Sequence, residues 1–468
     1  MASLDCQHFS DWPWRFWATH RPNATAIIRG LEPVSWHRLI DEVNAVSAGF
    51  YQCGVRRGHG VALRGKNSPE ILVAYLAALQ LGARVLPVNP LLADSLQAQL
   101  FPLLNIDYGW CAQRNEWPIG VQPLSSPRSS GERPLSNYIA PWPSDCAVTM
   151  TLTSGSSGLP KAAVHRPEAH LANADGLLQM MEFEAGDSWL LSLPLFHVSG
   201  QGIVWRWLLK GATLVQRELH PLTDALYGCT HASLVPTQLW RLLEQTADSF
   251  ALKQVLLGGA AIPIELTDRA TKQGIACWCG YGMTEMASTV CAKRANDTSG
   301  VGVPLPGREM RIVEREVWLR GSGQASGYWR NGKIHPFTDQ ESWFHTRDRG
   351  EWKDDELYIS GRLDNLFFSG GEGIQPEDIE RVLVSHPQVD QAFVVPVDNV
   401  EFGQRPVAVI DANAALDLAQ LSDWLRGRIA RFQIPDAYYF LPSGLKTGGI
   451  KISRLAVREW VNKVHRAL

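Results

Sequence analysis

Apolar stretches of strand length alternate with longer amphipathic stretches along most of this 468-residue chain. Short apolar runs, each typical of a buried strand, occur at residues 60–63, 85–88, 147–152, 189–193, 213–215, 232–235 and 254–257. Between them, residues 69–81, 201–209 and 237–245 have apolar positions at helical spacing. Strands that alternate with helices predict an α/β fold with a mostly parallel sheet.

The pattern changes twice toward the C-terminus. Residues 311–320 alternate between apolar and charged side chains, which predicts antiparallel strands in a smaller sheet or barrel. Beyond residue 364 we predict a helix at 376–385, strands at 389–397 and 405–411, and a helix at 416–431. The prediction is therefore a large N-terminal domain, 1–363, of layered α/β subdomains plus a small antiparallel sheet or barrel. A small α+β C-terminal domain, 364–468, follows it.

Composition and charge favour small-molecule chemistry. Charged residues make up 19% of the chain, and 44 basic against 47 acidic side chains give a net charge of −3. A balance so close to neutral provides no basic stripe for nucleic acid and no polybasic patch for anionic lipid. Residues 118–145, which are rich in proline and serine, predict a surface loop.

Targeting and cysteine patterns predict a cytoplasmic protein. Residues 1–15 carry several charges and lack the apolar core of a signal peptide. The most apolar stretch, residues 71–88, is interrupted by Gln80, Gly82, Arg84 and Pro87, so it predicts a buried helix that runs into a strand rather than a membrane span. The eight cysteines are scattered without a C-x-x-C pair, which suggests neither disulfides nor a zinc site.

Residues 150–161 form a loop suited to a phosphate chain. Gly155 and Gly158 allow the backbone N–H groups to approach an anion, and Lys161 adds a positive charge. Hydroxyl donors come from Thr153, Ser154, Ser156 and Ser157. The spacing matches neither a Walker A loop nor a G-x-S-x-G nucleophile elbow. A plain Gly/Ser surface loop is the structural alternative.

Residues 280–285 form a second candidate. Tyr281, flanked by Gly280 and Gly282, offers a ring for a purine, and Thr284 and Glu285 offer a hydroxyl for a phosphate and a carboxylate for Mg²⁺. Taken alone, this segment is also consistent with an ordinary turn between a strand and a helix.

Two further segments complete the set. Asp348, in residues 345–350, is suited to accept hydrogen bonds from both ribose hydroxyls, and Arg362 is suited to brace the same sugar or its phosphate. A salt bridge at a turn is the alternative for this pair. Residues 446–454 form a glycine-bearing turn in which one lysine can neutralise charge that develops at an α-phosphate. Most lysine-rich termini are simply solvated.

These four segments occur in the order and approximate spacing of the acyl-adenylate-forming superfamily, which includes acyl-CoA synthetases, non-ribosomal peptide adenylation domains and luciferases. The chain resembles this superfamily over essentially its whole length, because residues 74–90 and 361–380 also resemble family motifs. The resemblance implies a ligase that uses ATP, Mg²⁺ and CoA. It adenylates a carboxylate and then passes the acyl group to the CoA thiol.

The resemblance also implies roles for individual residues. Residues 154–158 with Thr153 and Lys161 would bind the ATP phosphates, Thr284 the α-phosphate and Glu285 the Mg²⁺. The adenosine would be bound by Gly259, Ala260, Ala261, Tyr281, Gly282, Asp348 and Arg362. Lys451 corresponds to the catalytic lysine, Asp364 to the hinge, and Gly370 and Gly371 to the tunnel for the CoA thiol.

Three positions depart from the family pattern. Ala162, Arg347 and Ile450 stand where the family commonly has glycine, respectively after the phosphate-loop lysine, before the ribose aspartate and before the catalytic lysine. None of them removes a proposed catalytic group, so the departures concern local geometry.

A narrower resemblance concerns the acid. Residues 9–15, 193–202, 230–241 and 364–373 look very similar to the o-succinylbenzoate–CoA ligase family of bacterial menaquinone synthesis. This resemblance implies 2-succinylbenzoate, ATP and CoA as substrates, and a homodimer. From the charge balance and the interrupted apolar stretch we expect no nucleic acid partner and no stable membrane insertion. The expected acyl-site residues are His197, Ser199, Gln201, Gly202, Gly258 and Ser288.

The sequence leaves two questions open. The second carboxylate of the acid needs a partner, and His197, Gln201, Arg206 and Arg241 are all candidates. Other functions also remain: a synthetase for another aryl or acyl acid, a stand-alone enzyme that loads a carrier protein, or a silent nucleotide-binding protein. The presence of Lys161, Glu285 and Lys451 disfavours the silent binder.

Overall fold

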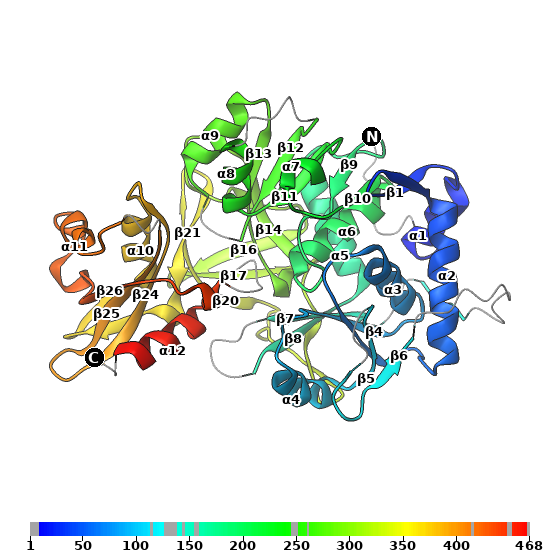
Figure 1. Cartoon of the computed structure of the whole chain (residues 1–468), viewed down its shortest axis with the longest axis horizontal. Helices are drawn as coiled ribbons and strands as arrows, with labels where there is room; N and C mark the ends of the chain where they lie inside the picture. Colours follow the sequence, from blue (N-terminus) through cyan, green and yellow to red (C-terminus); the bar gives the residue numbers. More distant parts are fainter. Residues whose placement is uncertain are drawn as a thin grey trace. The chain divides into compact units, whose positions relative to one another are not determined.

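The structure is a computed structural model, described for residues 9–112, 116–125, 138–142, 146–153, 159–244, 251–259, 262–412, 416–446 and 452–465 (Figure 1). The chain divides into two compact units. One contains Met1–Met310 and Leu319–Phe344, and the other contains Arg311–Trp318 and His345–Leu468. The domain boundary and the hinge predicted at residue 364 remain predictions, because a division into compact units does not test for movement.

A nine-stranded sheet forms one layer of the first unit. Its strands, in spatial order, are β15 (Val303–Pro304), β14 (Ser288–Arg294), β13 (Ala276–Met283), β12 (Gln254–Leu257), β11 (His231–Leu234), β9 (Ser188–Leu190), β10 (Thr213–Gln216), β1 (Thr25–Arg29) and β2 (Glu32–Ser35). The strands from β13 to β1 are parallel, and antiparallel strands close both edges.

An eight-stranded sheet forms a second layer. Its strands, in order, are β19 (Lys333–His335), β18 (Gly327–Arg330), β8 (Lys161–His165), β7 (Thr149–Thr153), β4 (Arg84–Val88), β3 (Gly60–Arg64), β5 (Ile106–Trp110) and β6 (Gln122–Leu124). The strands from β7 to β6 are parallel, whereas β7, β8, β18 and β19 are antiparallel. The predicted α/β class is confirmed. The loop predicted over 118–145 was wrong at β6, which pairs with the edge of β5.

Helices cover these sheets. They are α1 (Pro13–His20), α2 (Trp36–Gln52), α3 (Pro69–Gln80), α4 (Asp94–Leu104), α5 (Pro167–Leu178), α6 (Val198–Lys210), α7 (Leu222–Ala225), α8 (Pro236–Glu244) and α9 (Ile264–Lys272). Ser68 caps α3 because its hydroxyl accepts from the Ile71 N–H, and Pro69 has the φ that a first helical position requires. Every residue from Ile71 to Gln80 is buried, as the apolar run at 71–88 predicts. Within the described part of the chain, no helix is long and apolar enough to cross a membrane.

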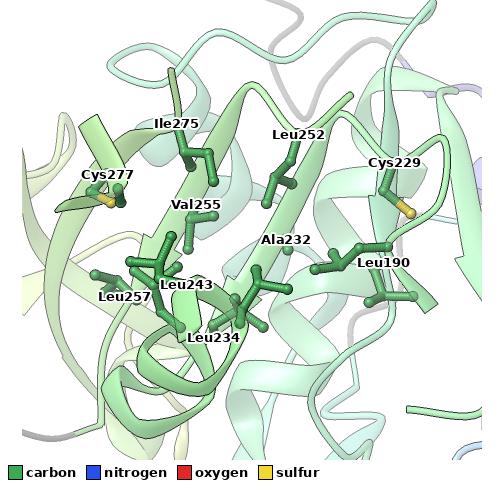
Figure 2. Packing of buried hydrophobic residues seen from close by; sticks show 14 of the residues in the cluster. Leu190, Cys229, Ala232, Leu234, Leu243, Leu252, Val255, Leu257, Ile275 and Cys277 are labelled. Carbon is green, nitrogen blue, oxygen red and sulfur yellow. The ribbon is translucent and has the colours of Figure 1, made fainter. Parts of the chain in front are cut away.

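An apolar cluster fixes the parallel strands of the nine-stranded sheet (Figure 2). Leu234 and Leu257 project from β11 and β12 and pack with Leu243 of α8 and Leu266 of α9. Each of these side chains is fully or almost fully buried. Burial of a leucine contributes about 2 kcal/mol, so the cluster holds the strand ends that carry the candidate site in place.

The C-terminal part of the chain is built from antiparallel strands and short helices. One sheet has the order β16 (Arg308–Val313), β17 (Glu316–Gly321), β20 (Phe344–Lys353) and β21 (Glu356–Arg362). Another contains β23 (Glu372–Ile374), β22 (Phe367–Ser369), β25 (Gly403–Ala412) and β24 (Val389–Asn399), with β26 (Ala437–Phe440) beside β25. The helices are α10 (Pro376–Val384), α11 (Gln420–Leu425) and α12 (Arg454–His465), with the short turns η3 (Leu363–Asn365), η4 (Arg431–Gln433) and η5 (Ser443–Leu445).

One predicted helix is much shorter than expected. The helical pattern at 416–431 corresponds only to α11, which ends at Leu425. The next residue, Arg426, is extended with ψ 132°, and Gly427 has φ 75°, in the left-handed region. A glycine in that conformation ends a helix at little steric cost, whereas the apolar spacing beyond it predicts continuation.

Candidate active site

Antiparallel strands β7 and β8 hold the two ends of the predicted phosphate-binding loop. Thr153 ends β7, Lys161 begins β8, and the two residues are register partners. The loop residues Ser154, Gly155, Ser156, Ser157 and Gly158 lie outside the described residues. Ala162, where the family commonly has glycine, is completely buried in β8 and pairs with Leu152 and Trp329. The sheet therefore accommodates a side chain at this position.

A cavity of about 150 Å³ opens beside the base of this loop. It is lined by Pro87, Asn89, Leu92, Leu152, Thr153, Pro160, Phe196 and His197. Among the described residues, Nε2 of His197 is buried without a hydrogen-bond partner. Burial also lowers the pKa of His197, so the imidazole is neutral near pH 7. A predicted nucleotide residue, Thr153, and a predicted acyl residue, His197, thus line one cavity.

The residues predicted to bind the adenine lie where β12 ends beside β13. Leu257 of β12 pairs with Cys279 of β13, and a Cβ on Gly258 would lie 3.4 Å from the carbonyl oxygen of Gly280. Tyr281 and Gly282 lie on β13 itself, because pairing with β14 extends this strand to Met283. Gly259 adopts φ 83° beyond β12, and Ala260 and Ala261 lie outside the described residues.

Thr284 and Glu285 begin the short helix η2 (Thr284–Met286) at the end of β13. Glu285 is 8% exposed, and its Oε1 accepts a hydrogen bond of 2.7 Å from the hydroxyl of Tyr328. In the described ranges there is no cluster of three or more acidic, histidine or cysteine residues that could hold a metal without a substrate. A lone buried carboxylate instead fits Mg²⁺, which proteins often bind through one or two carboxylates and the phosphates of the substrate.

The predicted acyl-site residues lie largely along α6. A Cβ on Gly202 would lie 3.1 Å from Oγ of Ser288 and 3.2 Å from Nη2 of Arg206, so these three residues meet at one point. Ser199 lies one turn earlier and is partly buried. Gln201 is fully buried, and its amide donates to Oγ1 of Thr151 at 2.9 Å and to the Leu195 carbonyl at 3.1 Å. Its donors are therefore bound within the fold.

Arg206 is a buried cation. It is 1% exposed, its guanidinium lies 5.2 Å from the ring centroid of Trp189, and its Nη2 donates to Oγ1 of Thr289 at 3.4 Å. Across the described ranges no carboxylate forms an ion pair with it, and its Nε is buried without a hydrogen-bond partner. Burial lowers the pKa of Arg206 to about 9. A buried charge without a counterion is costly, which is typical of a group that receives an anionic ligand.

Asp348 and Arg362, the predicted ribose pair, face each other across β20 and β21. Their positions are register partners, and Nη1 of Arg362 donates to Oδ1 of Asp348 at 3.0 Å. Nη2 of Arg362 donates to Oδ2 of Asp364, also at 3.0 Å. Burial alone would lower the pKa of Arg362, but the carboxylates of Asp348 and Asp364 together raise it.

Arg347 shows why the family favours glycine before this aspartate. It adopts φ 62°, in the left-handed region, although it is not glycine. Its backbone N–H donates to Oε1 of Glu316 at 2.8 Å, which helps to hold that conformation. This part of β20 thus keeps a left-handed backbone conformation, which suits glycine, although an arginine stands there.

Asp364 and the two predicted tunnel glycines lie at turns. Asp364 lies in η3, and Gly370 and Gly371, with φ 58° and 86°, form the tip of the hairpin between β22 and β23. Lys451 and Ile450 lie outside the described residues.

Three residues of the site were missed by sequence reasoning. Asn89 lines the cavity, Trp189 lies under Arg206, and Tyr328 binds Glu285. Asn89 lies in the Pro-Val-Asn-Pro segment at the end of residues 74–90, which resemble a family motif, so the sequence does mark this position. Trp189 and Tyr328 have no local signal, since their partners are distant in the sequence.

Comparisons with known proteins place these features in a family. The sequence profile described as "AMP-binding enzyme" matches residues 14–100 and 110–329, and the profile of the "AMP-binding enzyme C-terminal domain" matches residues 378–451. The chain is 55% identical over 453 residues to the 2-succinylbenzoate–CoA ligase of Salmonella typhimurium, with 97% of this chain and 98% of that protein covered.

Solved structures agree with the sequence comparison. A variant of Escherichia coli MenE with bound OSB-AMS superposes with a TM-score of 0.91 at 51% identity, covering 97% of this chain and 99% of that one. The o-succinylbenzoate coenzyme A synthetase of Bacillus subtilis, in complex with ATP and a magnesium ion, gives a TM-score of 0.83 at 24% identity. That comparison covers 92% of this chain and 95% of the other, and it bears on the fold alone.

Proposed function

Because the chain belongs to the AMP-binding enzyme family, we propose that it is a 2-succinylbenzoate–CoA ligase. The identity of 55% to the Salmonella enzyme extends over nearly the full length of both chains, so it includes both the nucleotide and the acyl segments. The pathway expected from the resemblance is menaquinone biosynthesis.

The reaction has two balanced steps. A carboxylate oxygen of 2-succinylbenzoate attacks the α-phosphorus of ATP, the bond to the β-phosphate oxygen breaks, and pyrophosphate leaves. The sulfur of CoA then attacks the acyl carbon, AMP leaves, and the thiol proton is released. The first step brings two anions together, so catalysis depends on positive charge and oriented donors around the phosphates.

Residues of the described site supply part of that environment. Lys161 offers a cation at the mouth of the phosphate loop, and Thr284 offers a hydroxyl to the α-phosphate. Glu285 would hold the Mg²⁺, which neutralises charge on the phosphates when it is bound with ATP. Tyr281 presents its ring to the adenine, and Asp348 accepts from the ribose hydroxyls.

The single observation that carries the choice of acid is Arg206. Its buried guanidinium lacks a carboxylate partner among the described residues, and it lies with Gly202 and Ser288, two of the expected acyl-site residues. The acid has a second carboxylate, which remains charged after the first one is adenylated. We assign Arg206 to that second carboxylate, because pairing the two charges relieves the cost of burying each of them.

The other open candidates fit this role less well. Gln201 already donates to Thr151 and Leu195 inside the fold. Arg241 lies on the exposed side of α8. His197 is neutral near pH 7 and so offers a hydrogen bond rather than a charge. It lines the cavity beside the phosphate loop, where it can contact the acyl chain.

The C-terminal residues complete the proposal. Lys451 stabilises the transferring phosphoryl group in the first step, and Gly370 and Gly371 form the passage for the CoA thiol in the second. Asp364 is the hinge that exchanges them, between domains 1–363 and 364–468. These roles are supported by the family resemblance of residues 361–380 and 446–454.

The test is a product assay with Lys451→Ala in parallel. Purified protein is incubated with MgATP, CoA and, separately, 2-succinylbenzoate, benzoate or a medium-chain fatty acid, and pyrophosphate and product mass are followed. We expect a thioester mainly from 2-succinylbenzoate, and a fall of about 100-fold or more in Lys451→Ala. Lys463→Ala, an exposed lysine of α12, is the matched control and should retain activity.

The other outcomes separate the rival functions. Pyrophosphate release without a CoA product would favour an enzyme that loads a carrier protein. Equal or better turnover of another acid would replace 2-succinylbenzoate as the substrate, and no turnover with any acid would favour a silent binder.

The oligomeric state and the cellular location are also part of the proposal. We propose a homodimer in the cytoplasm; in the described part of the chain, all cysteines are free, as a reducing compartment favours. Light scattering of the purified protein at several concentrations tests the dimer.

A further inference from the structure

Tyr328 lies between two residues of the proposed phosphate site. Its hydroxyl donates to Oε1 of Glu285 at 2.7 Å, and Nζ of Lys161 lies 5.0 Å from the centroid of its ring. Glu285 and Lys161 come from different elements, η2 and β8, and Tyr328 from a third, β18. One side chain thus contacts both the proposed metal ligand and the proposed phosphate-binding cation.

The backbone around Tyr328 is tightly held. Tyr328 pairs with Ala163 in the antiparallel ladder of β18 and β8, and the Ser326 N–H donates to the Val164 carbonyl at 2.8 Å. The Ala325 N–H donates to the backbone carbonyl of Glu285, also at 2.8 Å. The segment that carries Tyr328 is therefore bonded to both of the elements whose side chains it contacts.

Residues near Tyr328 in the sequence also hold its ring in place. Phe337 packs against it with a centroid distance of 5.0 Å. Gly327 allows the close approach of β19, because it adopts φ 144° and a Cβ there would lie 2.6 Å from the His335 carbonyl oxygen. These contacts fix where the hydroxyl points.

The chemistry of the two contacts is complementary. A hydrogen bond to one oxygen of a carboxylate restricts its rotation, and such bonds to metal ligands commonly change metal affinity by 10- to 100-fold. The face of an aromatic ring attracts an ammonium group by about 0.5–1 kcal/mol at exposed sites and by more when water is excluded. The hydroxyl of Tyr328 therefore orients the Glu285 carboxylate, and the face of its ring attracts the Lys161 ammonium group.

We propose that Tyr328 is a positioning residue for phosphate and metal binding. It orients the Glu285 carboxylate toward Mg²⁺ and holds the Lys161 ammonium at the mouth of the phosphate loop. The part that concerns Mg²⁺ rests on the proposed function. The contacts of Tyr328 with Glu285 and Lys161 do not depend on that function.

The test measures binding rather than turnover. Calorimetry gives the Kd of ATP with Mg²⁺ and with EDTA, and the Kd of AMP with EDTA. In Tyr328→Phe, which keeps the ring and removes the hydroxyl, we expect the gain in ATP affinity from Mg²⁺ to fall by about 10- to 100-fold. The Kd values of AMP and of metal-free ATP should stay close to those of the wild type. Tyr227→Phe, at a tyrosine that is 72% exposed, is the matched control.

A second variant tests the cation contact. Tyr328→Leu also removes the ring face, so metal-free ATP should bind several-fold more weakly than to Tyr328→Phe. If Tyr328→Leu does not fold, Tyr328→Met, whose flexible side chain fills the space without a ring face, takes its place and leaves Lys161 unchanged. An unchanged effect of Mg²⁺ in Tyr328→Phe would overturn the metal part of the proposal, and unchanged metal-free ATP binding in the second variant would overturn the cation part.

The design separates this proposal from the proposed function. If the wild type binds MgATP but forms no thioester from 2-succinylbenzoate, the proposed function fails while the binding comparison still stands. In a Glu285→Ala background, Tyr328→Phe should cause no further loss of the Mg²⁺ effect, because it acts through that carboxylate.

Discussion

At the scale of single residues, buried charge and buried histidine carry the most information about this protein. Arg206 keeps a guanidinium almost completely out of water with no acidic partner in the described part of the chain. His165 and His170 pack together at a centroid distance of 4.9 Å behind the site, and His170 stacks on Trp205. Burial destabilises the charged form of each of these side chains, and this effect leads to a measurable prediction for each of them.

Arg206→Met should reduce kcat/KM for 2-succinylbenzoate by about 100- to 5,000-fold. Methionine keeps much of the apolar stem but removes the charge, and loss of one partner of a buried pair costs about 3–5 kcal/mol. Turnover of benzoate, which lacks the second carboxylate, should change far less. Arg241→Met, on the exposed side of α8, is the control. Equal losses of kcat/KM for both acids in Arg206→Met would contradict the assignment.

Stability should fall as the pH falls from 7 to 5. Burial lowers the pKa of His165 to about 4, and of His170 well below its ordinary value. Between about pH 6.5 and pH 4 the unfolded chain therefore binds more protons than the folded one, and acid favours unfolding. His165 alone accounts for about 2 kcal/mol between pH 7 and pH 5.

Urea unfolding at both pH values measures this effect. The loss of unfolding free energy between pH 7 and pH 5 should be smaller in His165→Asn than in the wild type. A loss of the same size in the variant would show that other groups cause the pH dependence.

At the scale of elements, strand pairing delivers the site residues to their places. β13 carries Tyr281, and its pairing with β14 brings Gly282 close to Ser288. A Cβ on Gly282 would lie 2.1 Å from the carbonyl oxygen of Ser288 and 2.7 Å from its carbon. Both atoms are backbone, so neither moves without disturbing the ladder.

Gly282→Ala should therefore lower both stability and nucleotide affinity. Overpacking against backbone typically costs about 1–3 kcal/mol, and a displaced β13 moves Tyr281 away from the adenine. Thermal unfolding and the Kd of AMP measure the two effects. Gly186→Ala is the matched control, because a Cβ there meets nothing within 4 Å. Unchanged AMP affinity in Gly282→Ala would contradict the role of this strand in adenine binding.

At the scale of the whole molecule, the proposed chemistry needs two arrangements of one chain. The resemblance of residues 361–380 to a hinge motif predicts a division of labour between the two half-reactions. Asp364 is the predicted hinge, and it lies in the short turn η3 directly after β21. A change confined to this residue should affect the step that follows the movement more than the step that precedes it.

Asp364→Pro tests this idea, because proline fixes φ and restricts backbone rotation. We expect acyl-adenylate formation to stay within several-fold of the wild type. Thioester formation from supplied acyl-adenylate should fall by about 100-fold or more if the movement is required. Asp364→Ala, which removes only the side chain, is the control. A similar loss in both half-reactions would argue against a hinge at this residue.

Much of the fold followed from local patterns. The buried strands at residues 60–64 and 254–257 and the helix at 69–80 lie where the apolar periodicity predicts them, because these elements bury continuous apolar surface. The helix predicted at 416–431 was wrong in length, since the left-handed glycine at 427 stops it and periodicity does not report backbone conformation. The α/β class and the family motifs were likewise recognisable from the sequence.

The sequence by itself therefore determined most of the buried elements and the family, and it predicted the residue types of the candidate site, because each of these depends on neighbours along the chain. Only the tertiary structure decided that Arg206 is buried rather than solvated, since burial depends on Trp189 and Thr289, which lie in other elements. In the same way it joined Tyr328 to Glu285 and Lys161, through the pairing of β18 with β8. Such contacts arise from long-range packing, which no local pattern records.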